Sequence, residues 1–214
     1  MAGDSHGACA GARSVVSCPG APSCNPTFPE VTTIMRVCVF CSSSTGLPEA
    51  YTSAAHELGR ALASRGHELV FGGFDTGTMG DVARGCAEAG GRVCGIIDDG
   101  LRIAGAAVFP CDRLIVEPDL AHRKARMAQV ADAFVTLPGG LGTFDEYFSM
   151  MAQAKVGEVT ARIVLLNVCG YFDPLVAMLD RSTQTGLNST DWRDYGDVFV
   201  TADEALDYLE AHAR

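Results

Sequence analysis

A cluster of basic residues and one carboxylate further along are the side chains of this sequence best suited to chemistry. His122, Arg123, Lys124 and Arg126 fall within one short stretch, and Glu146 follows after the next apolar run. Arg123 and Arg126 are three residues apart and share one face of a helix. Cations in the first turns of a helix oppose its macrodipole, at a cost of up to about 1 kcal/mol each. The cluster is therefore either a solvated basic patch or a set of cations whose cost a bound anion offsets.

Three segments rich in glycine and hydroxyl groups could bring backbone N–H groups close to an anion. They follow apolar runs and precede helical patterns, at 42–46, 72–80 and 138–143. Unpaired N–H groups and the dipole of a helix start favour negative charge. A glycine after a strand is often only a tight turn, but three such segments at one sheet edge favour a phosphate ligand. No Gly-Lys-Ser or Gly-Lys-Thr occurs, which argues against a P-loop NTPase, and no Gly-x-Gly-x-x-Gly follows the first strand, which argues against a nicotinamide-dependent dehydrogenase.

Glu146 has two interpretations, which the sequence leaves open. Thr143-x-x-Glu146 matches a helix capping box, and capping alone would explain both residues. The pair also follows a Pro-Gly-Gly turn at a strand end, where a ligand is expected. A carboxylate held there beside a phosphate could orient a water molecule or stabilise a developing positive charge.

Short apolar runs alternate with longer helical periods along the chain. Strands are expected at 35–41, 67–73, 91–97, 112–117, 132–140, 162–168 and 197–201. Helices are expected at 48–65, 82–89, 119–131 and 143–156, after Pro174 and from Ala202, with an irregular connection between 97 and 112. Continuous apolar strands that each lead into a helix predict an α/β fold with a doubly wound parallel sheet covered by helices on both faces. Ligands are then expected at the carboxyl ends of the strands.

The composition excludes several classes of function. The 214 residues carry a formal charge of −10, which argues against a nucleic-acid or membrane-surface binder. No apolar run reaches the roughly 18 residues that span a bilayer. Nine cysteines, an odd number spread along the chain, are more typical of reduced thiols in a cytoplasmic protein than of a disulfide framework.

The first 34 residues differ from the rest of the chain. They contain four of the nine prolines and no leucine, and they lack the apolar core of a secretory signal. We expect 1–34 to be a disordered leader and 35–214 to form a single catalytic domain. Met35 opens the first strand pattern and could be the true start of the protein.

The basic cluster and the third glycine segment together resemble the LOG ("lonely guy") family of cytokinin riboside 5′-monophosphate phosphoribohydrolases. The family motif Pro-Gly-Gly-x-Gly-Thr-x-x-Glu matches 138–146, and the Arg-Lys pair that precedes it matches Arg123 and Lys124. The resemblance covers about 38 to 205 and includes Leu-Leu-Asn-Val-x-Gly-Tyr-Phe-Asp-Pro at 165–174. Differences at 74, 120–122 and 152–155 leave Arg123 and Glu146 in place.

The resemblance implies a Rossmann-like homodimer that needs no cofactor or metal. It would hydrolyse the N-glycosidic bond of a small nucleoside 5′-monophosphate, such as AMP or an N6-prenylated AMP, to free base and ribose 5-phosphate. Catalysis would fall to Arg123 and Glu146. The phosphate and nucleotide would be bound by Ser42, Ser43, Gly72, Gly73, Gly77, Met79, Gly80, Lys124, Gly139, Gly140, Gly142, Thr143 and Asp145.

Two other functions compete with this interpretation. Members of the family are often labelled lysine decarboxylases, but pyridoxal phosphate chemistry needs a Schiff-base lysine, and the chain has only Lys124 and Lys155. A non-catalytic nucleotide-binding or carrier protein on the same fold is the stronger alternative. A carboxylate beside an anionic ligand favours the enzyme, because a simple binder has little use for it.

Two smaller patterns have structural explanations as well as functional ones. Cys38 and Cys41 have the spacing of half a zinc site, but residues three apart on a strand point to opposite faces, so core packing is expected. Met150, Met151 and Ala154 form a stripe on the helix that carries Glu146. That stripe suits either a subunit contact or ordinary core.

Overall fold

Seven apolar runs form seven strands of one sheet in the computed structural model, which describes residues 34–213. The strands are β1 (Arg36–Phe40), β2 (Glu68–Phe71), β3 (Arg92–Asp98), β4 (Arg113–Glu117), β5 (Ala133–Thr136), β6 (Ile163–Leu166) and β7 (Gly196–Phe199). Each pairs in parallel with its neighbours in the order β4-β3-β2-β1-β5-β6-β7. The chain therefore builds the sheet outward from β1 in one direction and then from β5 in the other, as predicted for a doubly wound fold.

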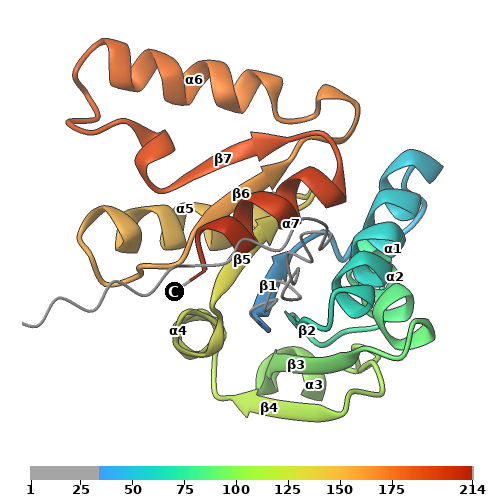
Figure 1. The fold of residues 1–214 in the computed structure, drawn as a ribbon. Coiled ribbons are helices and arrows are strands. Elements are labelled where there is room, and N and C mark those ends of the chain that lie inside the picture. The colour runs from blue at the N-terminus through green and yellow to red at the C-terminus, as the bar shows by residue number, and fades with distance from the viewer. Residues whose placement is uncertain (1–33, 214) are drawn as a thin grey trace, which may run out of the picture. The chain divides into compact units, whose positions relative to one another are not determined.

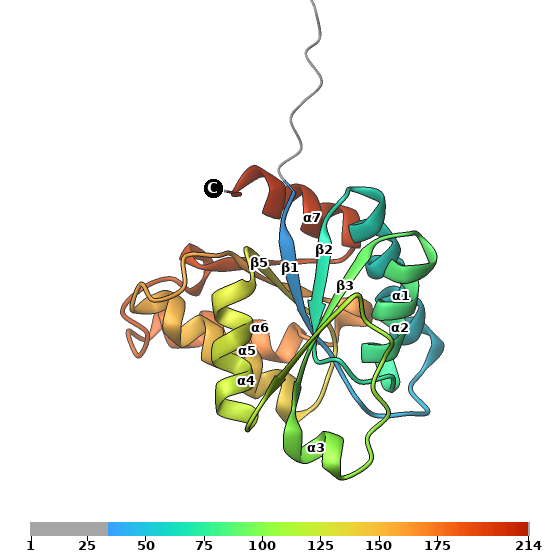
Figure 2. The same ribbon diagram turned by 90° about the horizontal axis from the view of Figure 1, so that it is seen from below.

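Helices cover both faces of this sheet (Figure 1). They are α1 (Glu49–Ser64), α2 (Gly77–Glu88), α3 (Asp99–Ile103), α4 (Leu120–Val130), α5 (Leu141–Lys155), α6 (Asp173–Gln184) and α7 (Ala202–Ala211), with short 3-10 turns at Val168–Gly170 and Trp192–Asp194. Figure 2 shows α1, α2 and α7 on one face and α4, α5 and α6 on the other. No helix within 34–213 is long and apolar enough to cross a membrane.

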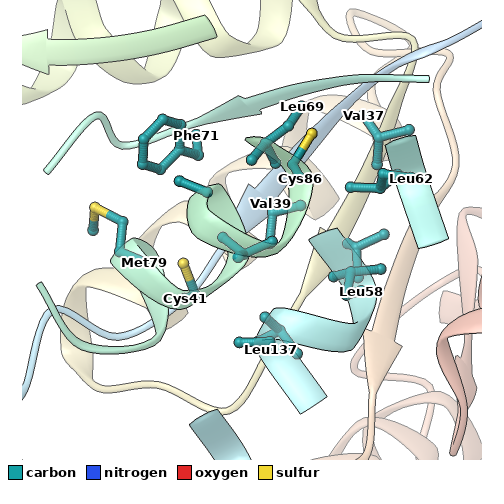
Figure 3. Packing of buried hydrophobic residues seen from close by; sticks show 14 of the residues in the cluster. Val37, Val39, Cys41, Leu58, Leu62, Leu69, Phe71, Met79, Cys86 and Leu137 are labelled. Atoms are coloured by element: carbon teal, nitrogen blue, oxygen red, sulfur yellow. The ribbon is translucent and has the colours of Figure 1, made fainter. Parts of the chain in front are cut away.

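Two apolar clusters follow from these two layers. One packs β1, β2 and β5 against α1, α2 and α7, and Figure 3 shows Cys41, Met79 and Leu137 at one end of it. The other packs the opposite sheet face against α4, α5 and α6. Cys38 belongs to the second cluster and Cys41 to the first, so the two thiols point to opposite faces, as the strand periodicity predicts. Met150, Met151 and Ala154 are buried in the second cluster, so the stripe on α5 belongs to the core of this chain.

Several element ends differ from the sequence prediction. Helix α5 begins at Leu141, with Gly140 as its N-cap, so the prediction that Thr143 caps the helix is wrong. The helix starts earlier because three residues between Thr136 and the cap suffice to leave the sheet, and glycine at the cap needs no side-chain bond. The connection after β3 contains the short helix α3, which Asp98 caps by accepting a hydrogen bond from the Leu101 N–H.

The expected leader lies outside the described residues, except for Ile34. Met35 is buried and its N–H donates to His67 Nδ1 at 3.3 Å. The described residues thus begin just before the first strand of the domain that was expected at 35–214.

Candidate active site

The glycine-rich segments meet at one edge of the sheet. They follow β1, β2 and β5, which are adjacent in the order β2-β1-β5 and run in parallel. Between β1 and β5 the winding of the chain reverses, so their two connections leave in opposite directions and open a crevice. The structure therefore brings the predicted phosphate-binding segments to the edge where this fold binds ligands.

The first two segments are bonded to each other. The Ser42 N–H donates to Thr78 Oγ1 at 2.9 Å, and the Met79 N–H donates to the Ser42 carbonyl at 3.1 Å. Gly77 has φ +56°, and a Cβ there would lie 2.4 Å from the Ser44 carbonyl. Glycine is required at this position because the start of α2 presses against the backbone of the first segment.

Much of the second segment is buried as packing. Gly72, Gly73, Met79 and Gly80 are all buried, and Met79 belongs to the apolar cluster beside β1. A Cβ at Gly72 would lie 2.2 Å from Arg123 Nη2, so this glycine makes room for the arginine. For Gly72, Gly73, Met79 and Gly80 the expected contact with a ligand stays a prediction. Ser43 of the first segment, in contrast, is exposed at the edge.

The third segment forms the start of α5. The first N–H groups of a helix have no partner within it, which leaves those of Leu141, Gly142 and Thr143 available, while the Phe144 N–H donates to the Gly140 carbonyl at 3.0 Å. Gly140 and Gly142 are exposed, and nothing lies within 4 Å of a Cβ added at either. Helix start, exposure and open space are together the features that suit an anion.

Thr143 fastens this segment to the neighbouring strand. It is buried, and its hydroxyl donates to the Cys41 carbonyl at 3.0 Å, just after β1. A Cβ at Gly139 would lie 2.1 Å from Thr143 Oγ1, so Gly139 allows the loop to fold over the threonine. The hydroxyl joins the loops after β1 and β5, which is a different role from the predicted cap.

Arg123 and Glu146 form a buried pair beside this edge. Arg123 lies on α4, where its Nε donates to the Ile96 carbonyl of β3 at 2.8 Å. Its Nη1 lies 3.4 Å from Glu146 Oε1, and both side chains are only about a tenth exposed or less (8% and 12%). The sequence predicted both as catalytic residues, and α4 and α5 place them together on the same side of the sheet.

Burial changes the chemistry of the carboxylate. It raises the pKa of Glu146 to about 7, although the neighbouring Arg123 guanidinium acts to lower it. Burial of a carboxyl group removes the water that stabilises its charge, and here that effect is the larger one. Glu146 can therefore take up or release a proton near neutral pH, as a general acid or base requires.

Two other basic residues of α4 pair with carboxylates other than Glu146. Lys124 Nζ lies 2.7 Å from both carboxylate oxygens of Asp145 and 3.1 Å from Ser149 Oγ. Arg126 Nε donates to Glu117 Oε1 at 2.7 Å. The cluster thus has two roles: Arg123 enters the site, and its neighbours join α4 to α5 and to β4.

A groove of about 220 Å³ lies beside the third glycine-rich segment. Its walls come from the loops after β1, β5 and β6 and from α1, namely Ser42, Ser44, Leu47, Tyr51, Pro138, Gly139, Gly140 and Tyr171. Sequence reasoning did not select Leu47, Tyr51 or Tyr171 as site residues. The only signal was that Tyr171 belongs to the conspicuous stretch at 165–174. A cavity of about 300 Å³ between Met35, Asp132 and Thr160 lies at the opposite edge of the sheet.

Comparison with known proteins shows the family of this chain. Residues 79–209 match the family described as "Possible lysine decarboxylase". The probable cytokinin riboside 5′-monophosphate phosphoribohydrolase LOGL1 of Oryza sativa subsp. japonica is 39% identical over 84% of this chain and 80% of its own. The chain belongs to the LOG family. The cytokinin riboside 5′-monophosphate phosphoribohydrolase LOG5 of Arabidopsis thaliana is 38% identical over 82% of this chain and 75% of its own.

Solved structures confirm the fold of this LOG-family chain. The molybdenum cofactor carrier protein of Chlamydomonas reinhardtii superposes with a TM-score of 0.63 at 21% identity, over 84% of this chain and 98% of that one. The molybdenum cofactor binding protein of Rippkaea orientalis superposes with a TM-score of 0.62 at 18% identity, over 84% and 97%. At such identities the likeness extends to the Rossmann-like α/β fold only.

The lysines do not fit the decarboxylase description of the family. A Schiff base needs an accessible amine beside the bound coenzyme. Lys124 Nζ is held by Asp145 and Ser149, and Lys155 Nζ, at the other end of α5, donates to Asn188 Oδ1 at 2.6 Å. Neither lysine therefore fits the role of a Schiff-base residue for pyridoxal phosphate. Within 34–213 no three His, Cys, Asp or Glu side chains gather as metal ligands.

Proposed function

We propose that this chain hydrolyses the N-glycosidic bond of a nucleoside 5′-monophosphate to give the free base and ribose 5-phosphate. The observation that carries the proposal is the buried Arg123–Glu146 pair, 3.4 Å apart, in which Glu146 lies on α5, the helix whose start presents the glycine-rich loop. A phosphate site and a proton-exchanging carboxylate then lie on one rigid element. The names of the LOG-family relatives support the same reaction class.

The phosphate is held by backbone groups in this mechanism. The free N–H groups of Leu141, Gly142 and Thr143 and the dipole of α5 supply favourable interactions with a dianion. Gly140 and Gly142 leave the space that a phosphate needs. The hydroxyls of the exposed loop after β1 complete the site from the other side of the crevice.

Glu146 acts at the ribose. Cleavage of an N-glycosidic bond passes through a sugar with oxocarbenium character, whose positive charge an adjacent carboxylate stabilises. The same carboxylate accepts a proton from the attacking water, which a pKa of about 7 permits at neutral pH. The water oxygen forms the new bond to the anomeric carbon, and the glycosidic electron pair leaves with the base. The base nitrogen then takes up a proton from solvent, and Glu146 releases the proton that it accepted, which restores the carboxylate.

Arg123 orients the carboxylate and the substrate. Its guanidinium is fixed at one end by the Ile96 carbonyl and directs Nη1 toward Glu146. The planar fork can also hold a ribose hydroxyl or a phosphate oxygen. Lys124 and Asp145, which pair with each other at the surface, contribute charge near the entrance.

We extend the proposal to the substrate and to the assembly. AMP and N6-prenylated AMP are the proposed substrates, a homodimer is the proposed assembly, and the six cysteine thiols that are free within 34–213 suit a cytoplasmic protein. The edge strand β4 supports self-association, because Leu114 and Val116 lie on one of its faces and remain 44% and 48% exposed.

Chromatographic detection of free base tests the reaction. Wild-type protein is incubated with AMP and with isopentenyladenosine monophosphate, and Glu146→Gln is the matched variant. We expect base release by the wild type and a loss of about 100-fold or more in the variant, because the amide cannot accept the proton. If the wild type binds AMP and releases no base from either nucleotide, the chain is a nucleotide-binding or carrier protein instead.

A further inference from the structure

The loop after β6 reaches across to the phosphate-binding loop after β5. Tyr171, in the loop after β6, donates its hydroxyl to the Gly139 carbonyl at 2.6 Å. Its ring packs edge-on against Tyr51 of α1, with centroids 5.9 Å apart, and against Phe172, with centroids 5.0 Å apart. The tyrosine thus reaches the groove from the loop after β6, whereas Arg123 and Glu146 come from α4 and α5.

The turn that presents Tyr171 is held in an unusual conformation. Cys169 has φ +53° and is the one non-glycine residue in the left-handed region within 34–213, and Gly170 follows with φ +69°. Asn167 secures the turn, since its side-chain oxygen accepts from the Phe172 N–H at 2.7 Å and its amide donates to Asp173 Oδ1 at 2.7 Å. A strained backbone persists only where the surrounding contacts hold it. These contacts place the Tyr171 hydroxyl at Gly139.

The bond to Gly139 controls a second group in the same peptide. A trans peptide is planar, so the Gly139 carbonyl and the Gly140 N–H point in opposite directions. A hydrogen bond that holds the carbonyl toward Tyr171 therefore aims the Gly140 N–H away from it. Gly140 is exposed and caps α5, whose free N–H groups follow directly. Thr143 restricts the other side of Gly139.

We propose that Tyr171 is a positioning residue for the phosphate site: its hydroxyl orients the Gly139–Gly140 peptide so that the Gly140 N–H donates to the 5′-phosphate. The proposal rests on the proposed function and adds a residue to its binding site. Without the hydroxyl, the peptide between the half-buried Gly139 and the exposed Gly140 can rotate, and the N–H no longer faces the anion in every molecule. The effect is on phosphate affinity, and the reaction at the ribose is unchanged.

Tyr171→Phe tests this role, with Tyr195→Phe as the matched control. Both variants keep the ring and lose one hydroxyl bond, which at Tyr195 goes to Thr190 Oγ1 at 2.8 Å. Loss of one neutral hydrogen bond corresponds to about 2- to 10-fold in affinity. For Tyr171→Phe we expect KM and the calorimetric Kd for AMP to rise by that factor with kcat changed less than twofold. The Kd for inorganic phosphate should rise in parallel, and Tyr195→Phe should leave all of these values unchanged.

Several results would overturn the proposal. They are an unchanged Kd for AMP and phosphate in Tyr171→Phe, a fall in kcat at constant KM, or an equal effect in Tyr195→Phe. Calorimetry measures the Kd without turnover, so it tests the role of Tyr171 separately from the proposed hydrolase activity. A wild type that binds AMP without releasing base refutes the hydrolase, and the Kd of Tyr171→Phe still decides the role of the tyrosine.

Discussion

At the scale of single residues, the proposed chemistry depends on the buried pair of Arg123 and Glu146. Each side chain alone would be costly to bury, and their separation of 3.4 Å allows a partial pairing that keeps both near the crevice. The carboxylate still has its pKa raised to about 7 because burial outweighs the attraction of the arginine. Residues at functional sites commonly show such perturbed proton affinities.

The pH dependence of the rate follows from this carboxylate. The ionised form accepts the proton from water, so kcat/KM should rise with pH through about 7 and then level off. A pH–rate profile with AMP as substrate measures it. A profile that is flat between pH 5.5 and 8.5 would contradict the assignment of Glu146 as the base.

The pH dependence of stability has the opposite sign. The folded protein holds the Glu146 proton more tightly than an ordinary carboxyl with a pKa of 4.5, so its contribution to stability falls as the pH rises toward about 7. Glu146→Gln lacks this titration. Its free energy of unfolding relative to that of the wild type should therefore increase from pH 5 to pH 8, by at most about 3 kcal/mol. Urea unfolding at both pH values checks this, with the exposed Glu158→Gln as control. An equal difference at both pH values would refute the raised pKa.

Arg123 should not tolerate replacement by lysine. Arg123→Lys keeps the charge but has one ammonium group in place of the fork that reaches both Ile96 and Glu146. We expect kcat/KM to fall by about 10- to 100-fold. Because each factor of ten corresponds to about 1.4 kcal/mol, this is a loss of about 1.4 to 2.8 kcal/mol in transition-state stabilisation. Arg126→Lys on the same helix, where the partner is Glu117 of β4 instead of Glu146, should change it less than twofold. Equal losses in both variants would show that only the charge matters.

At the scale of elements, the turns after β1, β2 and β5 depend on glycine for two different reasons. Gly77 needs its positive φ and the absence of a Cβ, because the backbone of the first loop lies against it. Gly142, on the open side of the α5 start, has free space around it. One glycine is there for packing, and the other leaves room for a ligand.

Alanine substitution separates these two kinds of glycine. Gly77→Ala should lower the free energy of unfolding by about 2 kcal/mol or more, since it combines a strained backbone with a clash 2.4 Å from the Ser44 carbonyl. Gly142→Ala should leave stability unchanged or raise it by up to about 1 kcal/mol, because alanine favours the helix. Urea denaturation measures both. Equal stabilities of the two variants would contradict the packing described for Gly77.

At the scale of the whole molecule, the doubly wound order concentrates the site at one edge. Strands β2, β1 and β5 are neighbours although β5 is remote from the other two in the chain. Their loops meet where the winding reverses, and α4 and α5 approach the same place from one face. The negative net charge excludes a polyanion as ligand but not one small phosphate, which a helix start and a few cations can hold.

The proposed homodimer is also a property of the whole molecule. If the β4 edge forms the contact, replacing the exposed Val116 with Asp puts a charge into an apolar interface and should shift the protein toward monomer. Sedimentation velocity at micromolar concentration measures the change, and Val200→Asp, at another exposed site, serves as control. A wild type that sediments as a monomer, or a Val116→Asp that stays dimeric, would contradict the proposed contact.

The sequence by itself determined the elements and the choice of the proposed catalytic pair. Strand and helix periods arise from which side chains must be buried, and a local pattern records that directly. Arg123 and Glu146 could be chosen because their types and spacing, and the Pro-Gly-Gly turn between them, are local features. The resemblance to the LOG family rested on the same segments.

Only the tertiary structure decided which of these residues act together. It moved the cap of α5 to Gly140, paired Lys124 with Asp145, buried the Met150 stripe and brought Tyr171 to Gly139. These contacts join segments that are far apart in the chain, and the order of strands in the sheet sets which segments meet. A local pattern contains the periodicity of one element, whereas burial and proton affinity depend on its neighbours.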